Sequence, residues 1–170
     1  VDEWTRYTWI FTFASKNPPV PTIKQFLSQF GNKSGLRRIR TDLGGELAGS
    51  VDLRTTIQQA GYSLETTAPE SSFQNGVVER AHRTVAERMR AMLHGAGLPA
   101  RYWSYAARHA VYLMNRIPHH SLPRNTTPFE KFTGQRPSLH HLRVFGSRVV
   151  VRKPGGRRYK IDEEKTPCGI

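Results

Sequence analysis

The stretches FQNGVVER, residues 73–80, and TDLGGE, residues 41–46, decide the interpretation of the whole chain. Each places one acidic residue, Glu79 or Asp42, where the chain changes from one predicted element to the next. Asp42 follows a strand-like run and precedes two glycines. Ligands of open α/β sheets gather at such strand ends, which favours a ligand-binding carboxylate. Asp is equally common as a turn-forming residue, so both roles stay open for Asp42.

Glu79 lies in the first turn of a long helix that we predict from Gly76 to His94. The apolar stripe of this helix consists of Val78, Ala81, Val85, Met89 and Met92. An acidic residue in a first turn complements the helix dipole, which is worth about 0.3–1 kcal/mol. The helix face that carries Glu79 also carries Arg83, Ala86 and Arg90. The Glu79 carboxylate would therefore lie on a basic surface. Periodicity alone leaves a dipole role and a ligand role open.

The first hundred residues alternate between strand and helix patterns, which predicts an α/β domain. We expect strands at 7–13, 36–40 and 62–67, a helix at 23–30 that Gly31 closes, and a short helix carrying Leu53, Ile57 and Ala60. Ser50 is a typical N-cap for that short helix, and Gly61 is a typical stop.

A second long helix is predicted at about 100–116, ended by Pro118. Its helical spacing predicts a buried side consisting of Trp103, Ala107, Ala110, Met114 and Ile117. A short helix is expected at 128–132 and a strand at 143–151. The last thirty or so residues resemble the start of a small β module.

The net charge of +13 is concentrated in the second half of the chain. Residues 1–70 hold 8 Lys/Arg against 7 Asp/Glu, whereas residues 71–170 hold 18 against 6. Such a basic half favours a polyanionic partner, most commonly nucleic acid. A solvated basic surface, or one matched to an acidic protein, is the alternative.

Several site classes are disfavoured. Cys168 is the only cysteine, which excludes a disulfide within the chain and argues against a Cys/His zinc site. No apolar run approaches the roughly 18 residues that span a bilayer, and no signal peptide is evident. The seven histidines include the pairs His119-His120 and His140-His141, for which we predict surface or packing roles.

Ordered blocks along the chain closely resemble the integrase core of copia-type LTR retrotransposons. Besides the two opening stretches, the resembling blocks are VDEWTRYTW (1–9), LP (98–99), YW (102–103), LMNRIP (113–118), TPFE (127–130) and LRVFG (142–146). The resemblance runs nearly end to end, and the order of its blocks is more specific than any single motif.

The resemblance implies an α/β, RNase H-like integrase core with a D, D, E triad of carboxylates that binds two divalent metal ions. By match, Asp42 is the second acid and Glu79 the third. Residues 1–136 would form a partial catalytic core that lacks its first strand and most of its second. Residues 137–170 would form a linker and the beginning of an SH3-like domain.

The first Asp of the triad is expected upstream of the segment matched by residues 1–6. Asp2 and Glu3 align with a turn, so neither is predicted to be the missing acid. Because the missing strands are central in this fold, we expect an incomplete sheet with an exposed edge, poor folding in isolation and a fragment that is inactive alone.

The implied function is DNA integration: metal-dependent 3′-end processing and strand transfer of retrotransposon cDNA into target DNA. Mg²⁺ (or Mn²⁺) suits this chemistry because two such ions can clamp the attacking and leaving oxygens. The predicted DNA-binding residues are Gln74, Asn75, Arg83, Arg90, Arg148, Arg152, Lys153, Arg157 and Arg158. The alternative is a non-catalytic, degenerate basic nucleic-acid-binding or assembly module.

The expected partners are retroelement cDNA ends, target DNA and further copies of the parent protein, with no membrane. The expected location is the nucleus, preceded by a virus-like particle in the cytoplasm, and the protein is not expected to be secreted.

Overall fold

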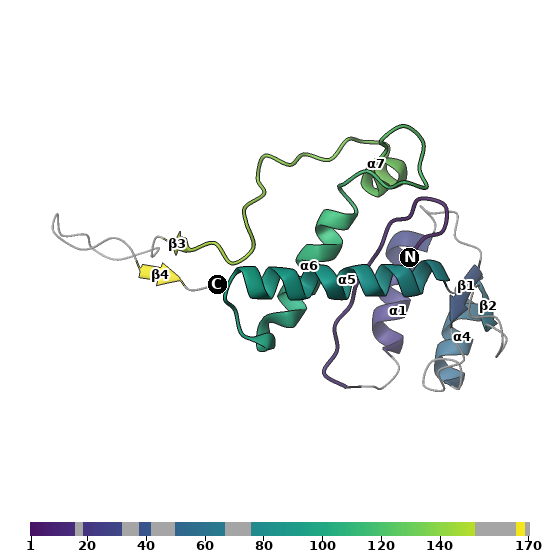
Figure 1. The fold of residues 1–170 in the computed structure, drawn as a ribbon. Coiled ribbons are helices and arrows are strands. Elements are labelled where there is room, and N and C mark those ends of the chain that lie inside the picture. The colour runs from purple at the N-terminus through teal and green to yellow at the C-terminus, as the bar shows by residue number, and fades with distance from the viewer. Residues whose placement is uncertain (16–18, 32–37, 42–49, 67–75, 152–165, 169–170) are drawn as a thin grey trace, which may run out of the picture.

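The first layer of the molecule is a parallel pair of strands with two helices packed on it. The computed structural model describes residues 1–15, 19–31, 38–41, 50–66, 76–151 and 166–168. In chain order the layer contains α1 (Val20–Phe26), continued by the π-helix η1 (Leu27–Gly31), β1 (Arg38–Thr41), α4 (Val51–Gln59) and β2 (Ser63–Thr66). The parallel register pairs Arg38 with Ser63 and Thr41 with Thr66. The carboxyl ends of β1 and β2 therefore lie at the same edge (Figure 1).

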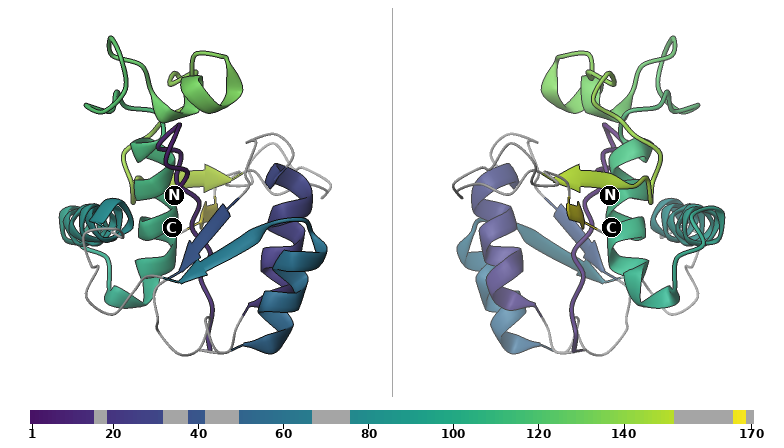
Figure 2. Two further views of the ribbon diagram at one scale, coloured as in Figure 1. Left: turned by 90° about the vertical axis from the view of Figure 1, so that its right-hand side faces the viewer. Right: turned by 90° about the vertical axis from the view of Figure 1, so that its left-hand side faces the viewer.

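Helices α1 and α4 lie on the same side of the β1–β2 pair (Figure 2). Leu27, Leu53 and Ile57 form the buried cluster between them, with exposed fractions of 3%, 1% and 1%. Partly buried side chains complete it: Val20, Ile23, Phe26, Ile39, Tyr62 and Leu64. This cluster positions the strand edge that leads to the candidate site.

The ends of α4 follow the predicted local chemistry. Ser50 is its N-cap, and the Ser50 Oγ accepts a hydrogen bond from the Leu53 backbone N–H at 3.3 Å. Gly61 follows the helix with a φ of +82°, a conformation that costs glycine no steric penalty. The predicted helix and both of its boundary signals are confirmed.

The second layer is a helix pair. Helix α5 (Gly76–Gly95) packs against α6 (Trp103–Met114), which the short 3-10 helix η3 (Ala100–Tyr102) precedes. Small buried residues on α6 allow close packing: Ala106, Ala107, Ala110 and Val111. The predicted burial of Trp103 is wrong, since its side chain is 45% exposed. Trp103 is the first residue of α6, one turn ahead of these buried residues.

The predicted strand at residues 7–13 is also wrong, because this segment forms no strand in the structure. The backbone groups of Thr8 are instead bound by one side chain of α6's C-cap residue. Asn115 Oδ1 accepts from the Thr8 N–H at 2.9 Å, and Asn115 Nδ2 donates to the Thr8 carbonyl at 2.8 Å. An amide side chain here occupies the position that a neighbouring strand has in a sheet.

The N-terminal turn follows the prediction for Asp2 and Glu3. The Thr5 N–H donates to Asp2 Oδ2 at 2.9 Å, and Glu3 forms an ion pair with Arg40 at 3.2 Å. Both carboxylates are therefore bound within the turn and to β1.

After α6, the chain forms the short helix α7 (Pro128–Thr133), as predicted, with Thr127 as its N-cap. The strand predicted at 143–151 is confirmed only as β3 (Val149–Val151), which pairs antiparallel with β4 (Thr166–Cys168). This pair lies away from the helices (Figure 1).

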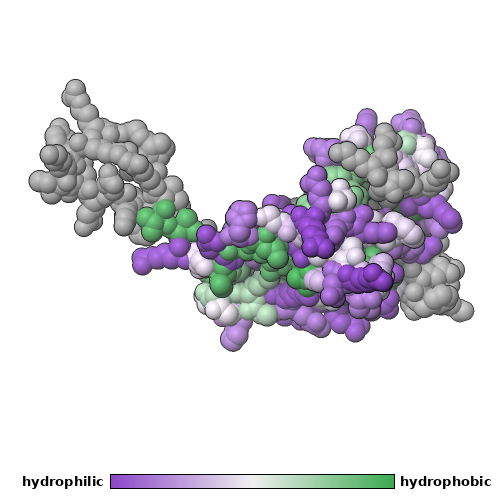
Figure 3. All heavy atoms as spheres, turned by 90° about the horizontal axis from the view of Figure 1, so that it is seen from above, coloured by the Kyte–Doolittle hydropathy of each residue, from purple (hydrophilic) through white to green (hydrophobic). Residues whose placement is uncertain are grey.

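Seen from above, the surface is mainly hydrophilic, with a hydrophobic area towards the β3 side (Figure 3). Exposed apolar residues in that part of the chain include Val144, Val149 and Val150. In the described part of the chain, no helix has both the length and the apolar character needed to cross a membrane.

Candidate functional site

Glu79 is presented to solvent at the start of α5. The helix begins at Gly76, and Glu79 is the acidic residue of its first turn. Leu93 is buried and Val85, Met89 and Met92 are half-buried, whereas the side chain of Glu79 is exposed. Because α5 packs against α6, Glu79 lies on a helix that is held in the fold.

The strand edge is the second part of the candidate site. β1 ends at Thr41, so Asp42 is the next residue after the carboxyl end of a parallel strand. Asp42 lies outside the described residues, as do Gln74 and Asn75, which belong to the segment from β2 to α5. The structure describes elements on either side of these residues, and the roles of Asp42, Gln74 and Asn75 stay predictions.

The face of α5 that carries Glu79 is basic. Arg83 and Arg90 are exposed, and Ala86 between them is half-buried. Charges four residues apart on a helix are neighbours, so Arg83 lies next to Glu79. Among the described residues, ion pairs join β1, β2, the N-terminal turn and α7, and none includes Glu79, Arg83 or Arg90. The Glu79 side chain is thus available to a cation, and the side chains of Arg83 and Arg90 are available to phosphate.

The basic run near the C-terminus is only partly described. Arg148 is exposed immediately before β3. Arg152, Lys153, Arg157 and Arg158 lie outside the described residues, and their predicted DNA contacts stay predictions.

A search of the described residues for three or more His, Cys, Asp or Glu side chains that could share a metal ion finds no group. In the two histidine pairs, His120, His140 and His141 are exposed and His119 is half-buried, as surface or packing roles require. The rings of His119 and His120 stack on each other with centroids 4.6 Å apart, and the Tyr112 hydroxyl contacts His141 Nε2 at 2.6 Å.

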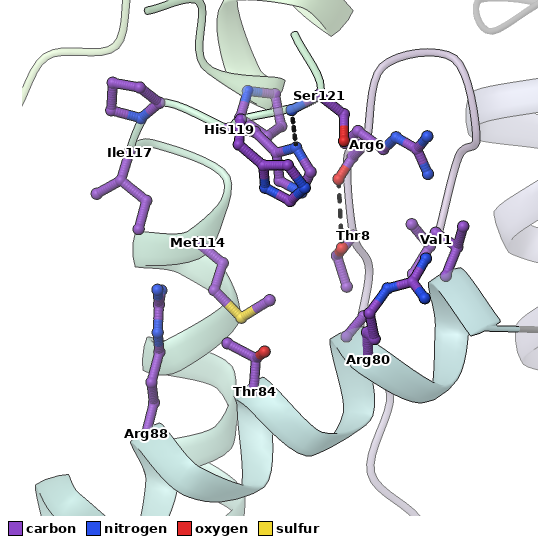
Figure 4. Close-up of a pocket in the computed structure, with 15 residues that line it drawn as sticks. Val1, Arg6, Thr8, Arg80, Thr84, Arg88, Met114, Ile117, His119 and Ser121 are labelled. Carbon is purple, nitrogen blue, oxygen red and sulfur yellow. Dashed lines mark hydrogen bonds between the residues drawn. The ribbon is translucent and has the colours of Figure 1, made fainter.

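A second face of α5 lines a cavity of about 410 Å³ that the sequence interpretation missed. Its polar lining comes from three places in the chain and consists of Arg6, Thr8, Arg80, Thr84, Arg88, His119, His120 and Ser121. In Figure 4, Arg80 and Arg88 extend from opposite ends of the α5 segment, and His119 lies across the cavity from them. Arg80 and Arg88 share one helical face, which is the only signal in the sequence that pointed here.

The surroundings of this cavity affect its histidine. Burial, with further contributions from His120 and Arg6, lowers the pKa of His119 below its usual 6.5. The Ser121 N–H donates to His119 Nδ1 at 3.1 Å, so the neutral imidazole carries its proton on Nε2.

Comparisons with known proteins find similar sequences over nearly the whole chain. Over 99% of its length the chain is 33% identical to a retrovirus-related Pol polyprotein from transposon TNT 1-94 of Nicotiana tabacum, of which it covers 13%. It is 35% identical over 100% of its length to the Pol polyprotein from transposon RE2 of Arabidopsis thaliana, of which it covers 12%. The chain is thus similar in sequence to these Pol polyproteins over nearly its whole length.

A third relative, the Pol polyprotein from transposon RE1 of Arabidopsis thaliana, is 34% identical over 99% of the chain. The chain spans 11–13% of the length of these curated Pol polyproteins. No protein-family model matches it.

Among solved structures, the chain resembles the catalytic core domain of BIV integrase in fold. The TM-score is 0.55 at 18% sequence identity, and the match covers 76% of this chain and 80% of the other. The match shows the fold, and the predicted α/β, RNase H-like fold of an integrase core is confirmed.

Proposed function

We propose that this chain is part of the catalytic core of a copia-type LTR-retrotransposon integrase and acts in DNA integration. The observation that carries the proposal is the exposed Glu79 carboxylate, which is free of ion pairs to described residues. It lies on the basic face of α5, and α5 follows the carboxyl edge of a parallel strand pair. The homology to Pol polyproteins along the whole chain supports it.

Asp42 and Glu79 are the residues that would hold divalent metal. Carboxylates are the hard oxygen ligands that Mg²⁺ and Mn²⁺ prefer, and the exposed side chain of Glu79 suits that role. When bound, two such ions supply charge stabilisation for the attacking and leaving oxygens of an in-line displacement at phosphorus.

The resembling family uses a third carboxylate, and the described N-terminal residues do not supply it. Asp2 is bound by Thr5 and Glu3 by Arg40. We propose that the first acid comes from upstream of Val1 in the parent protein, so the experiment below uses that parent.

Arg83 and Arg90 would hold the phosphates of a cDNA end beside Glu79. Gln74 and Asn75, directly ahead of α5, would contact the same DNA. Arg148, Arg152, Lys153, Arg157 and Arg158 would add sequence-independent contacts to the backbone of the DNA. Such a protein would act on cDNA and target DNA as a homo-oligomer, in the nucleus after import.

The test is strand transfer by the parent integrase with the substitutions Asp42→Asn and Glu79→Gln. Either change removes a ligand charge, and we expect activity with Mg²⁺ or Mn²⁺ to fall below detection while DNA binding is retained. Glu87→Gln is the matched control, since Glu87 is exposed on the same helix and should be replaceable. Undiminished strand transfer in either ligand variant would refute the proposal.

The second candidate is a non-catalytic, degenerate DNA-binding module. Its support is the net charge of residues 71–170 together with the single acidic residue, Glu79, that the described part of the site contains. This candidate would be favoured if the unmodified parent protein and its Glu79→Gln variant bound DNA equally well and neither transferred a strand.

A further inference from the structure

The cavity beside α5 collects positively charged side chains from α5, the N-terminal segment and the turn after α6. It lies between the first half of α5, the N-terminal segment and the turn after α6, and its volume is about 410 Å³. Arg80 and Arg88 come from α5, Arg6 from the N-terminal segment, and His119 and His120 from the turn (Figure 4). Pockets that hold small ligands typically measure about 300–1,000 Å³.

No negative charge compensates these side chains within the cavity. Among the described residues that line it there is no Asp or Glu. The ion pairs between described residues do not include Arg6, Arg80 or Arg88. Three arginines that line one concave site from its two ends raise the local positive potential. Burial lowers the pKa of His119 most, and the nearby His120 and Arg6 lower it further, in keeping with that potential.

The hydrogen-bonding groups of the cavity suit phosphate oxygens. Arginine presents a planar set of donors that matches phosphate geometry. His119 keeps a donor on Nε2, because its Nδ1 accepts from Ser121. Thr84 adds a hydroxyl between the two arginines of α5.

Apolar side chains form the remaining wall: Val77, Ala81, Met114, Ile117, Pro118 and Pro128. A site with cationic ends and an apolar wall suits a phosphate group attached to an organic body better than a bare ion.

We propose that this cavity binds a phosphate-bearing ligand through Arg6, Arg80 and Arg88. The ligand class is a terminal phosphate or diphosphate, carried either by a free nucleotide or by a nucleic-acid end. The proposal does not depend on the proposed function, because the cavity lies along the face of α5 that carries Ala81, Thr84 and Arg88, whereas Glu79, Arg83 and Arg90 lie on another face.

The test is calorimetric titration of the parent protein that contains this chain, with pyrophosphate as the probe. Arg80→Gln/Arg88→Gln removes two charges from the cavity face, and Arg83→Gln/Arg90→Gln removes two from the exposed face. We expect affinity to fall at least tenfold in the first variant and to change less than twofold in the second. An equal loss in both variants, or no binding by the unmodified parent protein, would overturn the proposal.

A thermal readout distinguishes loss of the site from loss of the fold. The clustered cations repel one another, so Arg80→Gln/Arg88→Gln should melt at or above the temperature of the unmodified parent protein without ligand. Pyrophosphate should raise the melting temperature of the unmodified parent protein and leave that of the variant unchanged. Arg6→Gln tests the same site from a different element and should also weaken binding. A ligand-induced rise retained by both variants would contradict the proposal.

Competition identifies the source of the phosphate. If the site takes a nucleic-acid end, a 5′-phosphorylated oligonucleotide displaces pyrophosphate better than the same oligonucleotide with a 5′-hydroxyl. If it takes a free nucleotide, ADP displaces pyrophosphate and the two oligonucleotides act alike. Failure of ADP and of the 5′-phosphorylated oligonucleotide to displace pyrophosphate would refute a site for phosphate esters.

Discussion

Helix α5 presents two basic faces with unlike surroundings. On the exposed face, Arg83 and Arg90 flank Glu79 and stand in solvent. On the other face, Arg80 and Arg88 border a cavity together with Arg6 and line it without an acidic partner among the described residues. The comparison shows that residue type alone does not assign a role to an arginine.

The physical difference is the access of solvent to Arg88, which is half-buried, whereas Arg83 and Arg90 are exposed, as is Arg80 at the rim of the cavity. Charges at an exposed face are screened by water and salt, which suits reversible contact with an extended polyanion. Charges in a cavity are screened less, so a small anion that fits gains more from each of them. The exposed face is therefore expected to bind an extended polyanion, and the cavity a small anion. Substitutions in one face should change binding at that face only.

The largest effect is expected from Ile57→Ala in the core beneath the strand edge. Ile57 is 1% exposed, and deletion of such a side chain costs about 2–5 kcal/mol. The layer that positions the end of β1 should weaken, which lowers strand transfer by the parent protein. Pyrophosphate affinity of the chain below its melting temperature should change less than twofold.

Urea denaturation and calorimetric titration check both halves of this prediction. Val51→Ala is the matched control, since Val51 lies on the same helix at 76% exposure. Equal losses for Ile57→Ala and Val51→Ala would show that the buried cluster does not support the strand edge.

Asn115→Ala should weaken the cavity and leave the exposed face of α5 unaffected. The buried Thr8 N–H and carbonyl both lose their partner, and each such group costs about 1–3 kcal/mol. Arg6 is two residues away, so pyrophosphate affinity should fall together with stability. DNA binding at the exposed face should be retained in a gel-shift assay. Weaker DNA binding with unchanged pyrophosphate affinity would break the comparison.

The smallest effect concerns pH and His119. Its pKa in the folded chain lies below the ordinary 6.5, so the unfolded chain binds this proton first as pH falls. Folding stability contributed by neutral His119 is thus present above pH 6.5 and is lost as pH falls below it. The charged or titratable residues that share its cavity are Arg6, Arg80, Arg88, His120 and Val1, which carries the α-amino group.

Urea denaturation at about pH 7.5 and 5.5 measures this loss on either side of the ordinary histidine pKa. His119→Gln should lose less stability than the unmodified chain, whereas the exposed His82→Gln should behave like it. Saturating pyrophosphate should reduce the loss, since a bound anion favours the charged imidazole. A larger loss in His119→Gln would contradict the assignment.

Much of the fold was predictable because its signals are local. The apolar stripe of α5, the Ser50 cap and the Gly61 stop each depend on residues within a few helical turns, and the structure confirms the helix, the cap and the stop. The resemblance to integrase cores supplied the fold class, which the structural comparison confirms.

The errors come from long-range contacts. The pattern of residues 7–13 predicts a strand, but the partner of Thr8 is the side chain of Asn115, which lies 107 residues away. The cavity escaped prediction for the same reason, since it joins Arg6, Arg88 and His119 from distant parts of the chain.

The sequence predicts both carboxylates of the candidate site, Asp42 and Glu79, and the structure describes one of them, Glu79. The structure confirms Glu79 in the first turn of α5 and exposure of Arg83, Arg90 and Arg148. Asp42 lies outside the described residues, and its pairing with Glu79 stays a prediction.

The salt dependence of DNA binding tests the separation of the two α5 faces most directly. Each phosphate contact on duplex DNA contributes about 0.9 to the slope of log affinity against log salt. On closed circular duplex DNA, which has no terminal phosphate for the cavity to bind, Arg83→Gln/Arg90→Gln should therefore reduce the magnitude of that slope by about 1.8, and Arg80→Gln/Arg88→Gln should leave it unchanged. The same reduction in both variants, or a reduction only in the cavity variant, would contradict the account.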